Sequence, residues 1–276
     1  MRDVLQKKAT ICIKTLFESV TERVMDYTVY ERECRQAEER IRAYLEEGRG
    51  DLARPQGAVR RLFEEVEKKT SSHGYAVGGR HMDRGYYCPS TIRDLVIVGQ
   101  HRGKLLRCPK AASVPSFRYG FDCDGRLLTV LTFKEQTGEV CRREVLFYEG
   151  EMTYGIAVNE DGSDLTLCVC HYGNEGIFSY RLYFYKVGGG VNRFFAEEYR
   201  REDEENAQVT FYEFRQQSFP EGKEPSPRLF DHRRYDCTVK DGVLLACYQT
   251  DFDSEGTALP PFAVHVFKRE GRIIRI

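Results

Sequence analysis

The sequence contains no tryptophan, no Cys-x-x-Cys pair and no long apolar run, although it is 276 residues long. Near the N-terminus, Lys14 and Glu18 interrupt the apolar stretch from Ile11 to Val20. A signal peptide needs an unbroken apolar region and a membrane helix needs roughly 18 apolar residues, and no stretch of the sequence meets either requirement. We therefore expect a cytoplasmic protein without a membrane segment.

An excess of charge of one sign is also missing. The chain has 42 Lys and Arg residues against 43 Asp and Glu residues, and residues 1–70 are as balanced as the remainder. Proteins dedicated to binding nucleic acids concentrate positive charge on one face or in one segment, so this balance argues against that class. The hydrophobic content of 41% and aromatic content of 12% are those of a folded chain rather than a disordered one.

Ten cysteines are present, but their spacing is not that of a zinc site or of a disulfide framework. Thiols in the cytoplasm are kept reduced, so an even count does not imply five disulfides. Cys168 and Cys170 share one face of an extended segment, which suits packing as well as metal ligation. We predict that the cysteines are mostly structural thiols.

Sequence motifs for cofactors are absent too. The glycine-bearing segment from Gly74 to Arg80 matches neither the dinucleotide fingerprint nor the P-loop, because no Lys-Ser/Thr pair follows it. The spacing of His73, His81 and Cys88 fits no common metal-ligand pattern. We predict no cofactor and no metal.

Residues 1–70 carry helical periodicity. Apolar residues recur every three or four positions from residue 3 to about 47, which predicts a helix. Residues 27–30 are β-branched and aromatic and favour helix weakly, so the pattern is compatible with one kinked helix or with two helices. A second helix is predicted from about Pro55 to Lys69, with Pro55 in its first turn. Residues 71–93 show neither helical nor strand periodicity, which predicts an irregular loop; a structureless stretch of this length is usually either functional or mobile.

Residues 94–276 alternate β-branched and aromatic runs with turn residues, which predicts about twelve to fourteen strands joined mainly as hairpins. The Asp-Gly pairs at 124–125, 161–162 and 241–242 mark hairpin turns. The expected strands are 95–99, 104–108, 116–122, 126–134, 140–148, 152–158, 164–172, 177–187, 192–200, 207–215, 235–240, 243–250, 262–268 and 272–276. The fold class is α+β, with N-terminal helices packed on a large, curved antiparallel β-meander; a partly closed β-barrel is the alternative.

One short segment carries a family resemblance. Residues Phe121 to Leu127 (FDCDGRL) resemble the Tyr/Phe-Asp-x-x-Gly-Arg-Leu unit of the YD-repeat shells found in bacterial polymorphic toxins. Residues Phe267 to Ile273 are a looser copy. The similarity covers about a tenth of the chain, and it has no fixed repeat period.

The aromatic residues provide a candidate binding surface. Tyrosines 180, 183 and 185 lie on one predicted strand and divide between its two faces. If one face is open, then Tyr180, Tyr183 and Tyr185 with Arg181 and Arg193 would form a binding surface. The alternative is that these aromatic residues pack beneath the helices.

For function, the absence of a catalytic motif favours an interaction protein with a protein partner, and the resemblance suggests a bacterial immunity-type protein that neutralises a toxin. One alternative is an enzyme whose site is built from scattered residues near the 71–93 loop, with His81, Arg84 and His171 as catalytic candidates. Another alternative is a small-molecule sensor that holds its ligand inside the curved sheet. The sequence leaves the oligomeric state open.

Overall fold

The computed structural model describes residues 27–79, 84–90, 92, 102–106, 114–173, 176–203, 205–217, 226–240, 243–253 and 256–266. Two α-helices come first, α2 (Tyr27–Glu47) and α3 (Pro55–Glu67), and a 3-10 turn, η2 (Gly85–Tyr87), follows strand β1. The strands are β1 (Ser72–Val77), β2 (Lys104–Leu105), β3 (Phe117–Phe121), β4 (Leu127–Phe133), β5 (Val140–Glu149), β6 (Met152–Asn159), β7 (Leu165–Gly173), β8 (Gly176–Lys186), β9 (Gly190–Arg201), β10 (Asn206–Gln217), β11 (Ser226–Lys240), β12 (Val243–Asp251) and β13 (Phe262–Val266).

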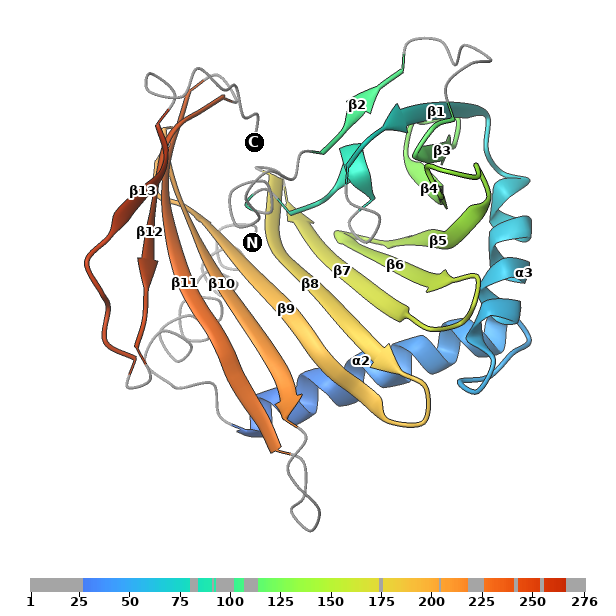
Figure 1. Cartoon of the computed structure of the whole chain (residues 1–276), viewed down its shortest axis with the longest axis horizontal. Coiled ribbons are helices and arrows are strands. Elements are labelled where there is room, and N and C mark those ends of the chain that lie inside the picture. The colour runs from blue at the N-terminus through green and yellow to red at the C-terminus, as the bar shows by residue number, and fades with distance from the viewer. Residues whose placement is uncertain are drawn as a thin grey trace, which may run out of the picture.

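All thirteen strands form one antiparallel sheet. From β3 to β13 each strand pairs with the next one along the chain, and β1 and β2 extend the sheet beyond β3. Figure 1 shows the sheet curling so that β2 and β13 rise on opposite sides of the molecule. The predicted antiparallel meander with N-terminal helices is confirmed, whereas the alternative of a barrel is not, because the sheet stays open.

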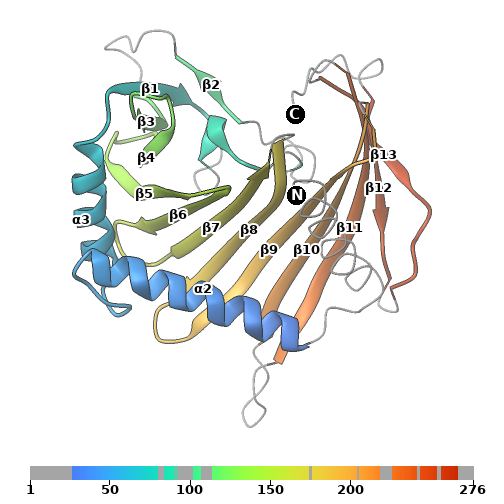
Figure 2. The same ribbon diagram turned by 180° about the vertical axis from the view of Figure 1, so that it is seen from behind.

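Helix α2 covers the outside of the curl with a single apolar stripe. Tyr30, Cys34, Ala37, Ile41 and Tyr44 are spaced at three- and four-residue steps and are all buried. Figure 2 shows α2 lying across the ends of the central strands. It contacts helix α3, and among the strands mainly β9 and β8, so the stripe packs on the middle of the sheet.

Helix α3 packs beside β4, β5 and β6 on the same outer face. Pro55 occupies its first turn, and the stripe that includes Val59, Leu62 and Phe63 is buried. The connection from α2 to α3 needs a glycine, because a Cβ on Gly50 would lie 2.5 Å from the Cβ of Ala58. The two helices and the outer sheet face together form the largest apolar core.

The inside of the curl holds two further apolar clusters. One surrounds Phe117 and Tyr119 near η2, and the other runs from Cys168 to Cys247 across β7–β12. Ile92 is fully buried in the second cluster. Residues 84–90 and Ile92 therefore lie against the inner face of the sheet, opposite the helices.

The prediction of an irregular loop at 71–93 is wrong for Ser72–Val77, because these residues form strand β1. These residues pair with β3 from Ser72 opposite Phe121 to Ala76 opposite Phe117. The segment lacks an apolar alternation of its own, so its strand conformation depends on backbone pairing with β3, which local sequence does not reveal.

Strand β11 is also longer than predicted, since it begins at Ser226 instead of residue 235. Charged residues occur throughout its first half, so this part of the strand lacks the alternation of apolar residues from which a strand is predicted. The predicted strands 95–99 and 272–276 and the helical residues 3–26 lie outside the described residues. In the described part of the chain, no helix is long and apolar enough to cross a membrane.

Candidate functional site

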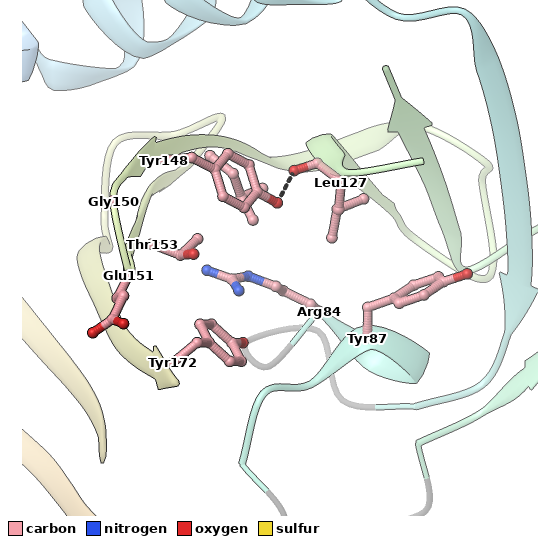
Figure 3. Close-up of a pocket in the computed structure, with 9 residues that line it drawn as sticks. Arg84, Tyr87, Leu127, Tyr148, Gly150, Glu151, Thr153 and Tyr172 are labelled. Carbon is pink, nitrogen blue, oxygen red and sulfur yellow. Dashed lines mark hydrogen bonds between the residues drawn. The ribbon is translucent and has the colours of Figure 1, made fainter. Parts of the chain in front are cut away.

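A cavity of about 420 Å³ opens on the inner face of the sheet. It lies between the segment that carries η2 and strands β4–β7, as Figure 3 shows. Its lining residues are Arg84, Tyr87, Leu127, Leu146, Tyr148, Gly150, Glu151, Thr153 and Tyr172. The side chain of Arg84 gives the cavity a polar centre. The three tyrosines and two leucines make its walls mainly apolar.

Arg84 is held in place by its backbone. It precedes η2 with a φ of 59°, a left-handed conformation that is uncommon for a residue other than glycine. The hydroxyl of Tyr119, on β3, donates a 2.9 Å hydrogen bond to the Arg84 carbonyl. This anchor directs the Arg84 side chain into the cavity, where its guanidinium extends between Tyr148, Thr153 and Tyr172 (Figure 3).

The guanidinium of Arg84 pairs with the carboxylate of Glu144 on β5. Glu144 Oε1 accepts a 2.7 Å hydrogen bond from Arg84 Nε and lies 2.6 Å from Nη2, and the two side chains are only 6% and 10% exposed. Burial opposes the guanidinium charge, whereas neighbouring Cys168 and Glu144 favour it, and the net effect raises the pKa of Arg84 above its ordinary value. Arg84 therefore stays charged across the physiological range.

The ion pair lies directly against the backbone of β6 at Gly155. A Cβ at this position would overlap Arg84 Nη2 and Glu144 Oε1. Gly155 is therefore required by the close approach of the charged pair to the strand.

Three tyrosine rings line the cavity, and those of Tyr148 and Tyr172 flank the guanidinium (Figure 3). The hydroxyl of Tyr148 donates a 2.6 Å hydrogen bond to the Leu127 carbonyl, and burial raises the pKa of Tyr148. Tyr87 packs edge-on against Tyr119 at 4.7 Å between ring centroids. Burial also raises the pKa of Tyr172, so these hydroxyls are neutral at physiological pH. The walls thus offer flat apolar surfaces together with uncharged polar groups.

One donor of Arg84 has no hydrogen-bond partner in the structure. Nη2 is buried, and its position relative to Glu144 is close enough for ion pairing but lacks hydrogen-bond geometry. A buried donor without a partner is costly, and a ligand oxygen would satisfy it. Arg84 is therefore the group in this cavity best suited to bind an acceptor.

Two cysteines lie beside the Arg84–Glu144 pair. Cys168 and Cys170 are buried on β7 with their Sγ atoms 3.7 Å apart. Burial raises the pKa of Cys168, which disfavours the nucleophilic thiolate. Within the described ranges, no group of three or more His, Cys, Asp and Glu side chains could hold a metal ion.

The three predicted catalytic candidates have different positions. Arg84 lies at the centre of the cavity. His171 is half-buried at the rim, where its Nε2 lies 3.3 Å from Glu151 Oε2, and the Glu151 carboxylate points away from Arg84 in Figure 3. His81 lies outside the described residues.

The predicted tyrosine-lined open face is wrong, because Tyr180, Tyr183 and Tyr185 are all buried. Tyr180 belongs to the inner core, whereas Tyr183 and Tyr185 pack in the outer core with α2. The hydroxyl of Tyr183 donates a 2.6 Å hydrogen bond to Glu33 Oε2 on α2. For these two residues the alternative of packing beneath the helices is correct, because α2 needs an apolar surface to cover.

The two predicted binding arginines, Arg181 and Arg193, form ion pairs within the sheet. Arg181 pairs with Glu198, and Arg193 Nε lies 2.8 Å from Glu213 Oε1. Neither arginine lines the cavity beside Arg84. The structure therefore does not bring the predicted binding residues together at the candidate site.

Sequence reasoning missed Glu144, Gly155 and the tyrosines of the cavity wall. A signal was present in β5, where Arg142, Glu144, Leu146 and Tyr148 alternate onto one face. Charged residues on the same face as apolar ones indicate buried polar groups. Their convergence on Arg84, however, depends on the curl of the sheet.

The segment that resembles the YD-repeat unit forms the turn between β3 and β4. Asp122 Oδ1 accepts hydrogen bonds from the backbone N–H groups of Asp124 and Arg126, at 3.0 and 2.9 Å. Asp122 Oδ2 also pairs with Arg126 Nε at 2.8 Å. These contacts explain the Asp-x-x-Gly-Arg spacing as turn chemistry.

Comparison with known proteins identifies no relative: no family model matches the chain, and neither a curated protein nor a solved structure matches it.

Proposed function

We propose that the protein binds a small organic molecule in the cavity around Arg84. The observation that supports this most directly is the buried guanidinium that projects into a cavity walled by tyrosines (Figure 3). Binding pockets for small molecules combine mainly apolar walls with a few convergent polar groups, and 420 Å³ lies within their usual size range. Among the functions considered from sequence, the small-molecule sensor has the most support.

The charges in the cavity suggest the class of ligand. Arg84 offers hydrogen-bond donors, and Glu144 already balances its positive charge. A ligand with one carboxylate or carbonyl oxygen would accept a hydrogen bond from the Arg84 guanidinium, and a flat apolar body would pack on Tyr148 and Tyr172. A cationic ligand would meet the guanidinium at close range and is disfavoured.

Ligand-observed NMR with three probes of similar shape tests this proposal. Benzoate and benzamide carry an acceptor oxygen, whereas benzylamine carries a cation. We expect saturation transfer from the protein to benzoate and benzamide and little to benzylamine. Equal transfer to all three, or none to any of them, contradicts the proposal.

Variants locate the binding. Arg84→Met keeps the length of the side chain and removes the donors, so binding of benzoate should be lost. Tyr172→Leu removes one ring at a partly exposed position and should weaken binding at least several-fold while the fold is retained. Arg40→Met, on α2 outside the curl, is the matched control and should bind as the parent protein does.

A protein-binding role, with a toxin-neutralising immunity protein as its specific form, is the second proposal. It is supported by the resemblance at Phe121–Leu127 and by the exposed side chains of Phe230, Tyr248 and Phe262 on β11–β13. Its test is affinity capture with the parent protein and with Phe230→Ser and Phe262→Ser. A stoichiometric partner that is retained equally by both variants would contradict a role for this surface.

The enzyme alternative has less support. At the cavity rim Glu151 and His171 pair with each other instead of facing Arg84. General acid–base catalysis needs a titratable group within hydrogen-bond reach of the reacting atoms. Binding of a small molecule is therefore better supported than catalysis.

A further inference from the structure

The sheet brings two cysteines into direct opposition far from the cavity. Cys237 on β11 pairs in register with Cys247 on β12. Their Sγ atoms are 3.3 Å apart, and the residues are 4% and 0% exposed on the inner face of the sheet. Both thiols are free.

Cross-strand geometry is suitable for a disulfide here. Residues directly opposite each other in an antiparallel pair have Cα atoms about 4.5–5.5 Å apart, within the range that disulfides span. Since a disulfide bond is about 2.05 Å long, the Sγ atoms of Cys237 and Cys247 need to approach by little more than 1 Å. Small side-chain rotations are enough for this movement.

The other close pair of cysteines provides an internal comparison. Cys168 and Cys170 lie two residues apart on one strand, with Sγ atoms 3.7 Å apart. At about 3.3–3.4 Å rise per residue, their Cα atoms are separated by roughly 6.7 Å, which is at the upper limit for a disulfide. The cross-strand pair is therefore the better placed of the two.

We propose that Cys237 and Cys247 form a reversible disulfide when the protein meets hydrogen peroxide. One cysteine, as its thiolate, attacks the peroxide; the O–O bond breaks, the sulfur becomes a sulfenic acid, and the second oxygen leaves as water after taking up the thiol proton. The second thiol then attacks the sulfenic sulfur, so that the S–S bond forms, the S–O bond breaks and the hydroxyl leaves with the proton as water. The two sulfurs are oxidised and the peroxide is reduced.

The surrounding strands favour local opening at this position. The register shifts between Thr238 and Val239 in the β11–β12 pairing and between Cys247 and Tyr248 in the β12–β13 pairing. Such irregularities disrupt the hydrogen-bond ladder, and ends of sheets open more readily than their centres. The hydrogen bond between the two thiols and burial together raise the pKa of Cys247, so this thiol is unreactive until the strands separate. The disulfide would then fix β12 to β11.

Peptide mapping of the full-length protein tests the proposal. Reduced protein is exposed to hydrogen peroxide under native conditions, free thiols are alkylated, and the protein is digested with trypsin. Cleavage after Arg234, Lys240 and Lys268 places the two cysteines in separate peptides, residues 235–240 and 241–268. We expect that the monomer yields these two peptides joined by a disulfide. After treatment with dithiothreitol, the two peptides should be recovered separately.

Three results would overturn the proposal. The first is recovery of both peptides unlinked, with alkylated or over-oxidised cysteines. The second is a link that forms only when urea is present. The third is oxidation confined to Cys168 and Cys170, which share the tryptic peptide 144–181 and would make it lighter by two hydrogen atoms.

Variants separate a specific link from general oxidation. Cys237→Ala should abolish the linked peptides, and Cys170→Ala, the matched control on the same inner face, should leave them in the same yield as the parent protein. If Cys237→Ala fails to fold, the mapping of the parent protein still decides the question.

Discussion

Removal of the charge of Glu144 is the sharpest test of how the cavity is built. Glu144→Gln keeps the shape of the side chain but leaves the Arg84 guanidinium, which is 6% exposed, without a counter-charge. Breaking a buried ion pair by removing one partner costs about 3–5 kcal/mol, because the remaining charge stays buried. At about 2 °C per kcal/mol for a protein of this size, the melting temperature should fall by about 6–10 °C.

The control for this variant is an exposed glutamate in the turn between β4 and β5. Glu139 precedes β5 and pairs with Lys134 at 3.5 Å, with both side chains more than half exposed. Exposed pairs are worth about 0–1 kcal/mol, so Glu139→Gln should shift the melting temperature by about 2 °C at most. Far-UV circular dichroism is the appropriate measurement, since the chain has no tryptophan.

A double-mutant cycle isolates the interaction itself. Arg84→Met should cost about as much as Glu144→Gln, but the double variant should be less destabilised than the sum of the two by about 2 kcal/mol, because neither charge is then left alone. If Glu144→Gln is no more destabilised than Glu139→Gln, or if the single effects add, the pair is hydrated and the description of the cavity centre is wrong.

The remaining predictions concern packing and pH. Gly155→Ala should destabilise the protein by about 1–3 kcal/mol and abolish benzoate binding, because the added methyl displaces Arg84 and Glu144; unchanged binding would contradict the close approach. Ile41→Ala should cost about 2–5 kcal/mol in urea unfolding, because this fully buried side chain anchors α2 on the sheet. Burial lowers the pKa of His232 to about 4, below its ordinary value of 6.5, so the unfolded chain binds the proton more readily. His232 therefore contributes stability above pH 6.5 that is lost as the pH falls toward 4, and His232→Gln should lose less stability than the parent protein over that interval.

The elements with strong local patterns were predictable from the sequence. Strands β3 to β10 lie within about two residues of their predicted bounds, because alternating apolar residues specify a strand and turn residues such as Asp124-Gly125 specify where it ends. Helix α3 begins at Pro55 as predicted. Strand β1 was missed because its conformation comes from pairing with β3 rather than from its own residues.

The candidate site was predictable only in part. Arg84 was a candidate because it lies in a segment without periodicity, but its partner Glu144 is 60 residues away and carries no motif. Tyr180 and Tyr183 were predicted to divide between the two faces of their strand, and they do lie on opposite faces of β8, in different cores. Their exposure could not be predicted, because it depends on which elements cover each face.

The sequence by itself determined the helices, the hairpins and therefore the antiparallel meander, because these follow from interactions between residues close along the chain. Tertiary structure alone decided the curl of the sheet, the side covered by the helices, the meeting of Arg84 with Glu144 and the register that places Cys237 opposite Cys247. These features depend on packing between distant residues, where a shift of one residue moves a side chain to the other face of the sheet.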